Sequence, residues 1–254
     1  MNAWLIAGGA LASGAAFTAF AAVAPGAQLF GPTLCHTTPP DKLALTFDDG
    51  PNPAITPQLL DLLDRHNAKA TFFVIGKYVR ESPALVKEIV ARGHVLGNHT
   101  DSHPNLFFCG PQETQDELRR CTEAIHQAAW LAPHWFRPPF GFRSPWLGEI
   151  AHRQGMRTVM WSLLPGDWRN KSAEWLTARM QPIADHARKK LPPGSGYGGG
   201  LLGDILCLHD GYHAASNADR TRTLAALQFW LPRWRDLGLE FVTIEQAQGK
   251  AVEA

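Results

Sequence analysis

The chain has 254 residues, of which 45% are hydrophobic and 19% are charged. A chain of this length buries a large core without help from disulfides or metals, and its composition excludes a collagen-like or largely disordered protein. The 24 basic and 23 acidic residues leave a formal net charge of +1. This balance excludes the global positive field that draws proteins to nucleic acids, so we expect no nucleic-acid partner and favour a neutral substrate.

The amino-terminal segment differs from the rest of the chain, because residues 1–40 contain no Asp, Glu, Lys or Arg. Residues 3–24 are long enough as an apolar helix to cross a membrane. Ala22-Val-Ala24 has the form of a signal peptidase site, although Pro25 follows it and no basic residue precedes the apolar run. We expect residues 1–30 to be a signal peptide or membrane anchor of an exported, envelope-anchored or secreted protein. A buried core helix and a misassigned start codon are alternatives.

Beyond Pro40, short β-rich runs alternate with amphipathic helical stretches. The runs predict seven strands, at residues 43–47, 70–75, 94–96, 135–136, 157–161, 205–208 and 240–243. Long helices are predicted near residues 112–130 and 220–237. No linker divides residues 41–252, so residues 31–254 are predicted to form one domain. This alternation predicts an α/β fold around a parallel sheet that closes, or nearly closes, into a barrel with its chemistry at the carboxyl ends of the strands.

Helix starts and cysteines carry further predictions. A hydroxyl residue precedes a proline at Thr56, Ser82 and Ser144, which predicts three helix N-caps with proline at the first helical position.

The four cysteines, an even number, allow three full disulfide pairings in an exported protein. Cys109 and Cys121 form the pair favoured by proximity, and four free thiols are the alternative.

Two adjacent carboxylates, Asp48 and Asp49, follow the first predicted strand. They repel one another unless a cation or an arginine balances them, and the alternation of an extended chain points them in different directions. His99 and His103, four residues apart after the third strand, have metal-ligand spacing. With Asp49 they form a two-histidine, one-carboxylate set suited to a hydrolytic divalent metal such as zinc, whereas turn formation alone is the structural alternative for both segments.

Other polar motifs follow other predicted strands. Arg137 is fixed by two prolines after the fourth strand, Asp167-Trp168 follows the fifth, and His209-Asp210 follows the sixth. Because the carboxyl ends of parallel strands meet at one edge, this placement predicts a single catalytic centre.

The ordered motifs resemble those of the polysaccharide deacetylases of carbohydrate esterase family 4, the NodB-like domain. The resemblance covers residues 41–242 and rests on Thr46-Phe-Asp-Asp-Gly50, His99-Thr-Asp-Ser-His103, Arg137-Pro-Pro-Phe-Gly141, Asp167-Trp168 and Leu208-His209-Asp210. It implies a distorted (β/α)7 barrel and metal-dependent removal of N-acetyl groups from N-acetylglucosamine-type units of peptidoglycan or chitin-like oligomers. Hydrolysis of another amide or ester at the same centre and an inactive glycan-binding module are the alternatives.

The resemblance also implies roles for individual residues. Asp49, His99 and His103 would bind the divalent metal, expected to be Zn²⁺, with Co²⁺ or another divalent ion as alternatives. Asp48 would be the general base that takes a proton from water, and His209 the general acid for the leaving amine. These assignments agree with the chemistry of a histidine that titrates near neutral pH.

Four further residues receive supporting roles from the resemblance. Arg137 would hold Asp48, and Asp167 would orient His209. The backbone N–H of Phe140 would face the oxyanion, and Trp168 would wall a pocket for the acetyl methyl group.

The chain departs from the family pattern at two positions near the acetyl pocket. Leu164 replaces an Asp, and Cys207 replaces a Leu, so Cys207 is expected to alter the pocket and its acyl specificity. Two other features receive structural interpretations: the GxGxxG pattern at residues 194–199 does not follow a strand and open a helix as a dinucleotide loop does, and His213 is interpreted as a solvated loop residue, with substrate contact as the alternative.

Overall fold

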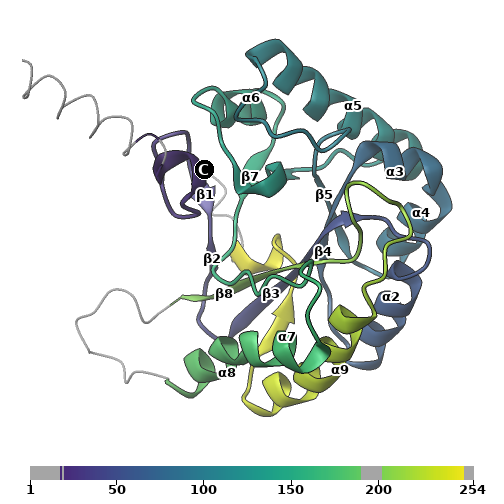
Figure 1. Ribbon diagram of the computed structural model, residues 1–254, viewed down its shortest axis with the longest axis vertical. Coiled ribbons are helices and arrows are strands. Elements are labelled where there is room, and N and C mark those ends of the chain that lie inside the picture. The colour runs from purple at the N-terminus through teal and green to yellow at the C-terminus, as the bar shows by residue number, and fades with distance from the viewer. Residues whose placement is uncertain (1–17, 19, 190–201, 249–254) are drawn as a thin grey trace, which may run out of the picture.

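The computed structural model describes residue 18 and residues 20–189 and 202–248, and helices surround its nearly closed sheet (Figure 1). The described strands are β1 (Thr33–Leu34), β2 (His36–Thr37), β3 (Lys42–Gly50), β4 (Thr71–Val74), β5 (Val95–Asn98), β6 (Trp135–Phe136), β7 (Arg157–Val159), β8 (Gly203–His209) and β9 (Glu240–Val242). The described α-helices are α2 (Thr56–Arg65), α3 (Gly76–Glu81), α4 (Pro83–Ala91), α5 (Pro111–Ala129), α6 (Leu147–Arg153), α7 (Ala173–Arg179), α8 (Gln181–Arg188) and α9 (Thr221–Asp236). The residues of the GxGxxG pattern, 194–199, lie outside the described residues.

Strand β3 organises the sheet. It pairs in parallel with β8 along one edge, while its other edge is shared by β9 near its start and β4 near its end. The parallel order continues from β4 through β5 and β6 to β7. Strand β1 pairs with β7 and strand β2 pairs antiparallel with β8, so residues 33–37 link the two ends of the sheet and nearly close the barrel.

All seven predicted strands are present and the nearly closed α/β barrel is confirmed, with two short strands, β1 and β2, in addition to those predicted. The last predicted strand, β9, pairs with only the first residues of β3, from Lys42 to Ala44. The closing strands β1 and β2 were not predicted, because strands of two residues carry no hydrophobic alternation.

The predicted hydroxyl caps are wrong in detail. Thr56 is the first residue of α2, and its hydroxyl accepts a hydrogen bond from the Asn52 N–H and donates one to Asp210. Ser82 is the N-cap of α4, yet its side chain forms no capping bond. Helix α6 begins only at Leu147, beyond Ser144. A residue before proline is disfavoured in the helical region, so the same pattern also fits an extended turn.

Side chains alternate in direction along β3 and β8, so each strand has an outer face towards the helices and an inner face. Leu43, Leu45 and Phe47 of β3 pack in the main cluster with residues of the helices, whereas Ala44 belongs to a separate cluster with Ile205 of β8. Since side chains alternate along a strand, the residues that continue this inner face towards the carboxyl end are Thr46 and Asp48 on β3 and Cys207 and His209 on β8. The inner face therefore changes from apolar to polar as it approaches the carboxyl ends.

The described part of the amino-terminal segment packs on the loop that follows β6. Residues 20–23 are helical, and the buried Arg143 guanidinium donates hydrogen bonds to the carbonyl oxygens of Ala21, Ala24 and Ala27. None of the helices in the described part of the chain combines the length and the apolar content that crossing a bilayer requires. Most of the predicted apolar helix, residues 1–17 and 19, lies outside the described residues.

The four cysteines are free thiols. Cys121 directs its sulfur to the carbonyl oxygen of Val74 at 3.3 Å, and Cys109 directs its sulfur to that of Asn105 at 3.6 Å. The two thiols that proximity in sequence would pair therefore have different partners, and the predicted disulfide is absent.

Candidate active site

The predicted site residues converge on one pocket at the carboxyl ends of the strands. The pocket has a volume of about 220 Å³ and is lined by eight of the ten predicted residues: Asp48, Asp49, His99, His103, Phe140, Trp168, Cys207 and His209. The other two, Arg137 and Asp167, are buried and hold residues that line the pocket. Leu164, one of the two departures from the family pattern, also lines it.

The position of Asp48 follows from strand register. Asp48 of β3 is paired with His209 of β8, and Thr46 is paired with Cys207 two residues earlier. The fully buried Arg137 reaches between these strands, and its Nη1 lies 2.7 Å from both Asp48 Oδ1 and Thr46 Oγ1. Its other nitrogens donate to the carbonyl oxygens of residues 159 and 160. A buried guanidinium with all these partners balances the Asp48 carboxylate.

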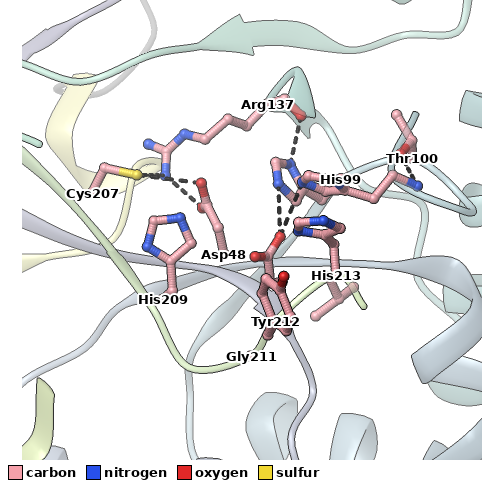
Figure 2. A network of polar contacts seen from close by, with 12 residues as sticks. Asp48, His99, Thr100, Arg137, Cys207, His209, Gly211, Tyr212 and His213 are labelled. Carbon is pink, nitrogen blue, oxygen red and sulfur yellow. Dashed lines mark hydrogen bonds and ion pairs between the residues drawn. The ribbon is translucent and has the colours of Figure 1, made fainter. Parts of the chain in front are cut away.

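Cys207 contacts the second oxygen of the same carboxylate. Its sulfur lies 3.3 Å from Asp48 Oδ2 and 3.5 Å from Arg137 Nη1. Figure 2 shows Cys207 beside these two side chains. Burial and the Asp48 carboxylate raise the pKa of the Cys207 thiol well above its usual value, so the thiol is neutral and donates its S–H to Asp48. The sequence pattern located Cys207 at the pocket but did not predict this hydrogen bond.

Asp49 points away from Asp48 towards two imidazoles. Its backbone has a φ of 71°, and its Oδ1 lies 3.1 Å from His103 Nε2 and 3.4 Å from His99 Nε2. The turn after β5 brings the two histidine rings to a centroid separation of 4.9 Å. His99 Nδ1 lies 2.8 Å from the Arg137 carbonyl oxygen (Figure 2), which only accepts hydrogen bonds, so Nδ1 carries a proton and Nε2 is the ring nitrogen that faces Asp49.

These three groups fit a divalent cation. Burial opposes ionisation of Asp49, but the imidazoles of His103 and His99 hold its pKa well below its usual value, so it is a carboxylate. Burial lowers the pKa of His103 and favours its neutral form. Asp49 Oδ1 is buried and forms no contact of hydrogen-bond geometry with the described residues. A cation between this carboxylate oxygen and the two imidazole nitrogens would balance the buried charge, and this donor set is typical of zinc and related metals.

His209 is held by Asp167 on the opposite side of the pocket. One carboxylate oxygen of Asp167 lies 2.8 Å from His209 Nδ1, and the other accepts hydrogen bonds from the His209 backbone N–H and the Thr223 hydroxyl. Burial works against protonation of His209, but the Asp167 carboxylate outweighs it and the pKa of His209 rises to about 9. The imidazole is therefore protonated at neutral pH.

Phe140 and Trp168 form the open side of the pocket. Phe140 has a φ of 56°, and its backbone N–H has no hydrogen-bond partner among the described residues. Trp168 packs edge-on to His209 at a centroid distance of 5.1 Å. Their side chains are 52% and 43% exposed, so both aromatic surfaces are accessible to a ligand.

Sequence reasoning missed Glu117 of α5, which shapes the turn that carries the two histidines. Its carboxylate accepts hydrogen bonds from the backbone N–H groups of Asp101 and Ser102 and from the Ser102 hydroxyl. Glu117 is buried and lies 14 to 18 positions from the histidines in sequence, so no local pattern links it to them.

Sequence reasoning also left Gly211 unassigned. A Cβ atom at Gly211 would collide with the Asp49 carbonyl oxygen, so only glycine lets the segment after His209 approach β3 this closely. The Asp-Gly pair that ends the motif at residues 208–211 is the signal that could have indicated this contact.

The fold and the site define a barrel-like α/β protein with a candidate cation site and a candidate acid–base pair in one pocket. Residues 36–159 match the family model for polysaccharide deacetylases. A chitooligosaccharide deacetylase of Bradyrhizobium sp. is 35% identical over 209 residues, which are 80% of this chain and 88% of that protein. The chain belongs to the polysaccharide deacetylase family.

Solved structures agree with this assignment. The crystal structure of the Bc1960 peptidoglycan N-acetylglucosamine deacetylase superposes with a TM-score of 0.71 and 29% identity, covering 85% of this chain and 92% of that one. A family 4 pseudoenzyme from Bacillus anthracis, BA3943, has a TM-score of 0.68 and 26% identity and covers 85% and 68% of the two chains. Since the same fold occurs in a pseudoenzyme, the acid and base residues carry the argument for catalysis.

Proposed function

We propose that this protein removes N-acetyl groups from N-acetylglucosamine units of a polysaccharide, by hydrolysis at a divalent cation. The observation that carries the proposal is the register pairing of Asp48 with His209, which sets a carboxylate and a protonated imidazole beside the Asp49, His99 and His103 donor set in one pocket.

The donor set would hold the cation through Asp49 Oδ1 and the Nε2 atoms of His99 and His103. When bound, a divalent cation supplies a Lewis acid that polarises the acetyl carbonyl and lowers the pKa of water. Zinc is proposed because one carboxylate and two imidazoles are typical zinc ligands, and cobalt suits the same donors.

Asp48 would accept the proton of the attacking water. Arg137 fixes one oxygen of the Asp48 carboxylate, since its Nη1 lies 2.7 Å from Asp48 Oδ1. The same nitrogen is held by the Thr46 hydroxyl, also at 2.7 Å. The carboxylate cannot rotate without breaking this buried contact, so its orientation towards the pocket is set before substrate binds. The Cys207 thiol restrains the remaining oxygen.

His209 would donate a proton to the leaving nitrogen. Its Nδ1 is occupied by Asp167 at 2.8 Å, so Nε2 is the nitrogen available to the substrate. A protonated imidazole can complete the reaction because an amine anion is a poor leaving group. The unpaired N–H of Phe140 would stabilise charge that develops on the acetyl oxygen.

The substrate class rests on the relatives and on the pocket. One relative acts on chitooligosaccharides and another on the N-acetylglucosamine of peptidoglycan. The exposed faces of Phe140 and Trp168 offer stacking surfaces for a sugar ring, and the net charge of +1 suits a neutral glycan. Cys207, at the base of the pocket, would adjust the space for the acyl group.

We also propose that the protein is exported, with residues 1–30 as a signal peptide or membrane anchor and residues 31–254 as the catalytic domain. The proposal is supported by the absence of charged residues in the first forty positions and by the location of the proposed glycan substrates outside the cytoplasm. Detection of the protein in envelope and culture fractions tests it, and a purely cytoplasmic distribution would overturn it.

The proposed activity is tested by acetate release from N-acetylglucosamine oligomers and peptidoglycan. Release should cease on chelation, return with zinc, and fall by about 10²- to 10⁴-fold in Asp48→Asn, the range expected for loss of a general base. Asp236→Asn, which changes an exposed carboxylate, is the matched control. Cation binding without turnover on any acetylated sugar would favour the glycan-binding alternative, and turnover only on O-acetylated or other esters would redirect the substrate class.

A further inference from the structure

A third imidazole lies beside the proposed cation ligands. The His213 ring stacks on the His103 ring with centroids 4.6 Å apart and an interplanar angle of 10°. Asp49, His103 and His213 each present a ligand atom, and these atoms lie within 4.8 Å of one another. Figure 2 shows His213 at the same side of the network as His99, on the segment that carries Gly211 and Tyr212.

The segment that carries His213 is fixed by side chains from two helices. Lys77 Nζ donates to the His213 carbonyl oxygen at 2.6 Å, and the Tyr78 hydroxyl donates to the carbonyl oxygens of Tyr212 and His213 at 3.1 and 3.0 Å. Arg220, at the start of α9, holds the Gly211 carbonyl oxygen at 2.8 Å. A freely solvated loop histidine would not have its backbone anchored in this way, so the expectation of a solvated residue does not describe His213.

The imidazole ring of His213 is available to bind a metal ion. Its nitrogens have no hydrogen-bond partners among the described residues, while its faces and edges contact His103, Phe140 and Tyr212. A histidine ring in its neutral form carries a lone pair on one nitrogen. Neutral imidazole is a preferred ligand of zinc.

We propose that His213 supplies a fourth protein ligand to the divalent cation held by Asp49, His99 and His103. The inference rests on the proposed function, because it concerns the same cation. A hydrolytic centre keeps a position for its substrate, so His213 is a ligand that the substrate displaces, whereas the other three stay bound throughout.

Two other roles for His213 make different predictions. If the ring only supports His103 by stacking, an aromatic ring without nitrogen will replace it. If the ring only contacts the glycan, its removal will raise KM and leave cation binding unchanged. Measurements of the cation itself separate these roles from ligation.

The experiment compares the full chain with His213→Ala and His213→Phe, and uses His134→Ala, which changes an exposed histidine, as the control. Zinc affinity is measured by competition with a chromophoric chelator, and the visible spectrum of the cobalt-substituted protein reports the ligands. Ligation predicts that zinc binds at least about 10-fold more weakly in both His213 variants, the minimum expected for residues that support a metal site. It also predicts that the cobalt spectrum changes in both and that free imidazole restores it in His213→Ala.

Zinc affinity and cobalt spectra equal to those of the unaltered chain in both variants would overturn the proposal, as would recovery in His213→Phe, which assigns the ring to stacking. If the unaltered chain itself binds neither metal, the proposed function fails as well, and this outcome is visible before any variant is compared.

Discussion

The two halves of the pocket are built differently, although adjacent residues of β3 begin them. On the Asp48 side, every charged group meets a protein partner: Arg137 and Cys207 contact Asp48, and Asp167 contacts His209. On the Asp49 side, a buried carboxylate oxygen faces two imidazoles without hydrogen-bond geometry. The first half is electrostatically complete in the protein alone, whereas the second requires a cation.

This difference implies that the two halves fail in different ways. Loss of a residue on the Asp49 side should release the cation and with it all activity. Loss of a residue on the Asp48 side should leave cation affinity unchanged and impair proton transfer. Each prediction therefore needs two measurements, cation binding and turnover.

The largest effect is expected for His103→Ala. The variant removes one of the three ligands proposed to stay bound throughout, so we expect it to lose tightly bound zinc and to reduce acetate release to the uncatalysed background. Metal content after gel filtration and a turnover assay check the two results. His134→Ala should behave like the unaltered chain, and His103→Ala that keeps stoichiometric zinc and activity would break the division of the pocket into two halves.

A pH-dependent effect is expected for Asp167→Asn. Asp167 contributes most to raising the pKa of His209 to about 9, so loss of its charge should lower that pKa towards the ordinary value of about 6.5. A general acid acts in its protonated form, so activity that persists up to about pH 9 in the unaltered chain should be lost at lower pH in the variant. At pH 8 an imidazole of pKa about 6.5 is only about 3% protonated, so turnover should fall by roughly 30-fold or more.

The pH dependence of kcat/KM, measured for Asp167→Asn beside Asp236→Asn, tests this prediction. Zinc affinity should be the same in both variants, because Asp167 does not touch the proposed cation ligands. An alkaline limb that does not move would show that His209 is not the acid, and a loss of zinc would show that the two halves are coupled.

Much of the fold was predictable because its signals are local. The strands from residue 43 onwards are continuous β-rich runs, and each was located within a few residues. The closure by β1 and β2 was not predictable, since it depends on pairing of residues 33–37 with strands more than 120 positions away. The capping hydroxyls failed for a related reason: Thr56 hydrogen-bonds to Asp210, a partner just after β8 that the local sequence does not reveal.

In the site, too, the features with local sequence signals were predictable and those that depend on distant contacts were not. Asp48, His99 and His209 lie in motifs at strand ends, where the parallel sheet guarantees that they meet. The Cys207 hydrogen bond to Asp48 depends on the register of β3 and β8, and the placement of His213 depends on Lys77 and Tyr78 of α3. These contacts join distant segments without a shared motif, so the sequence alone could not specify them.

The smallest effect is expected for Glu117→Gln, which tests whether the Asp49 side depends on its support from α5. One oxygen of the Glu117 carboxylate accepts the N–H groups of Asp101 and Ser102 between the two histidines, and the other accepts from the Arg120 guanidinium. An amide in its place keeps only one acceptor oxygen and would present an N–H₂ to one of these two sets of donors. The turn should loosen, and zinc affinity should fall by about 10-fold, as for other residues that orient metal ligands. Turnover at saturating zinc should change less than zinc affinity, because Asp48 and His209 keep their partners.

Glu123→Gln on the same helix is the matched control, since Glu123 is exposed and its ion pair within the described part of the chain is with Arg119. Zinc titration of both variants, with thermal unfolding to confirm that each is folded, measures the effect. If Glu117→Gln lowers turnover at saturating zinc as much as it lowers affinity, the support from α5 reaches the Asp48 side too, and the two halves do not act independently. Equal zinc affinity in the two variants would instead show that Asp49 and the backbone of the turn position the histidines without Glu117.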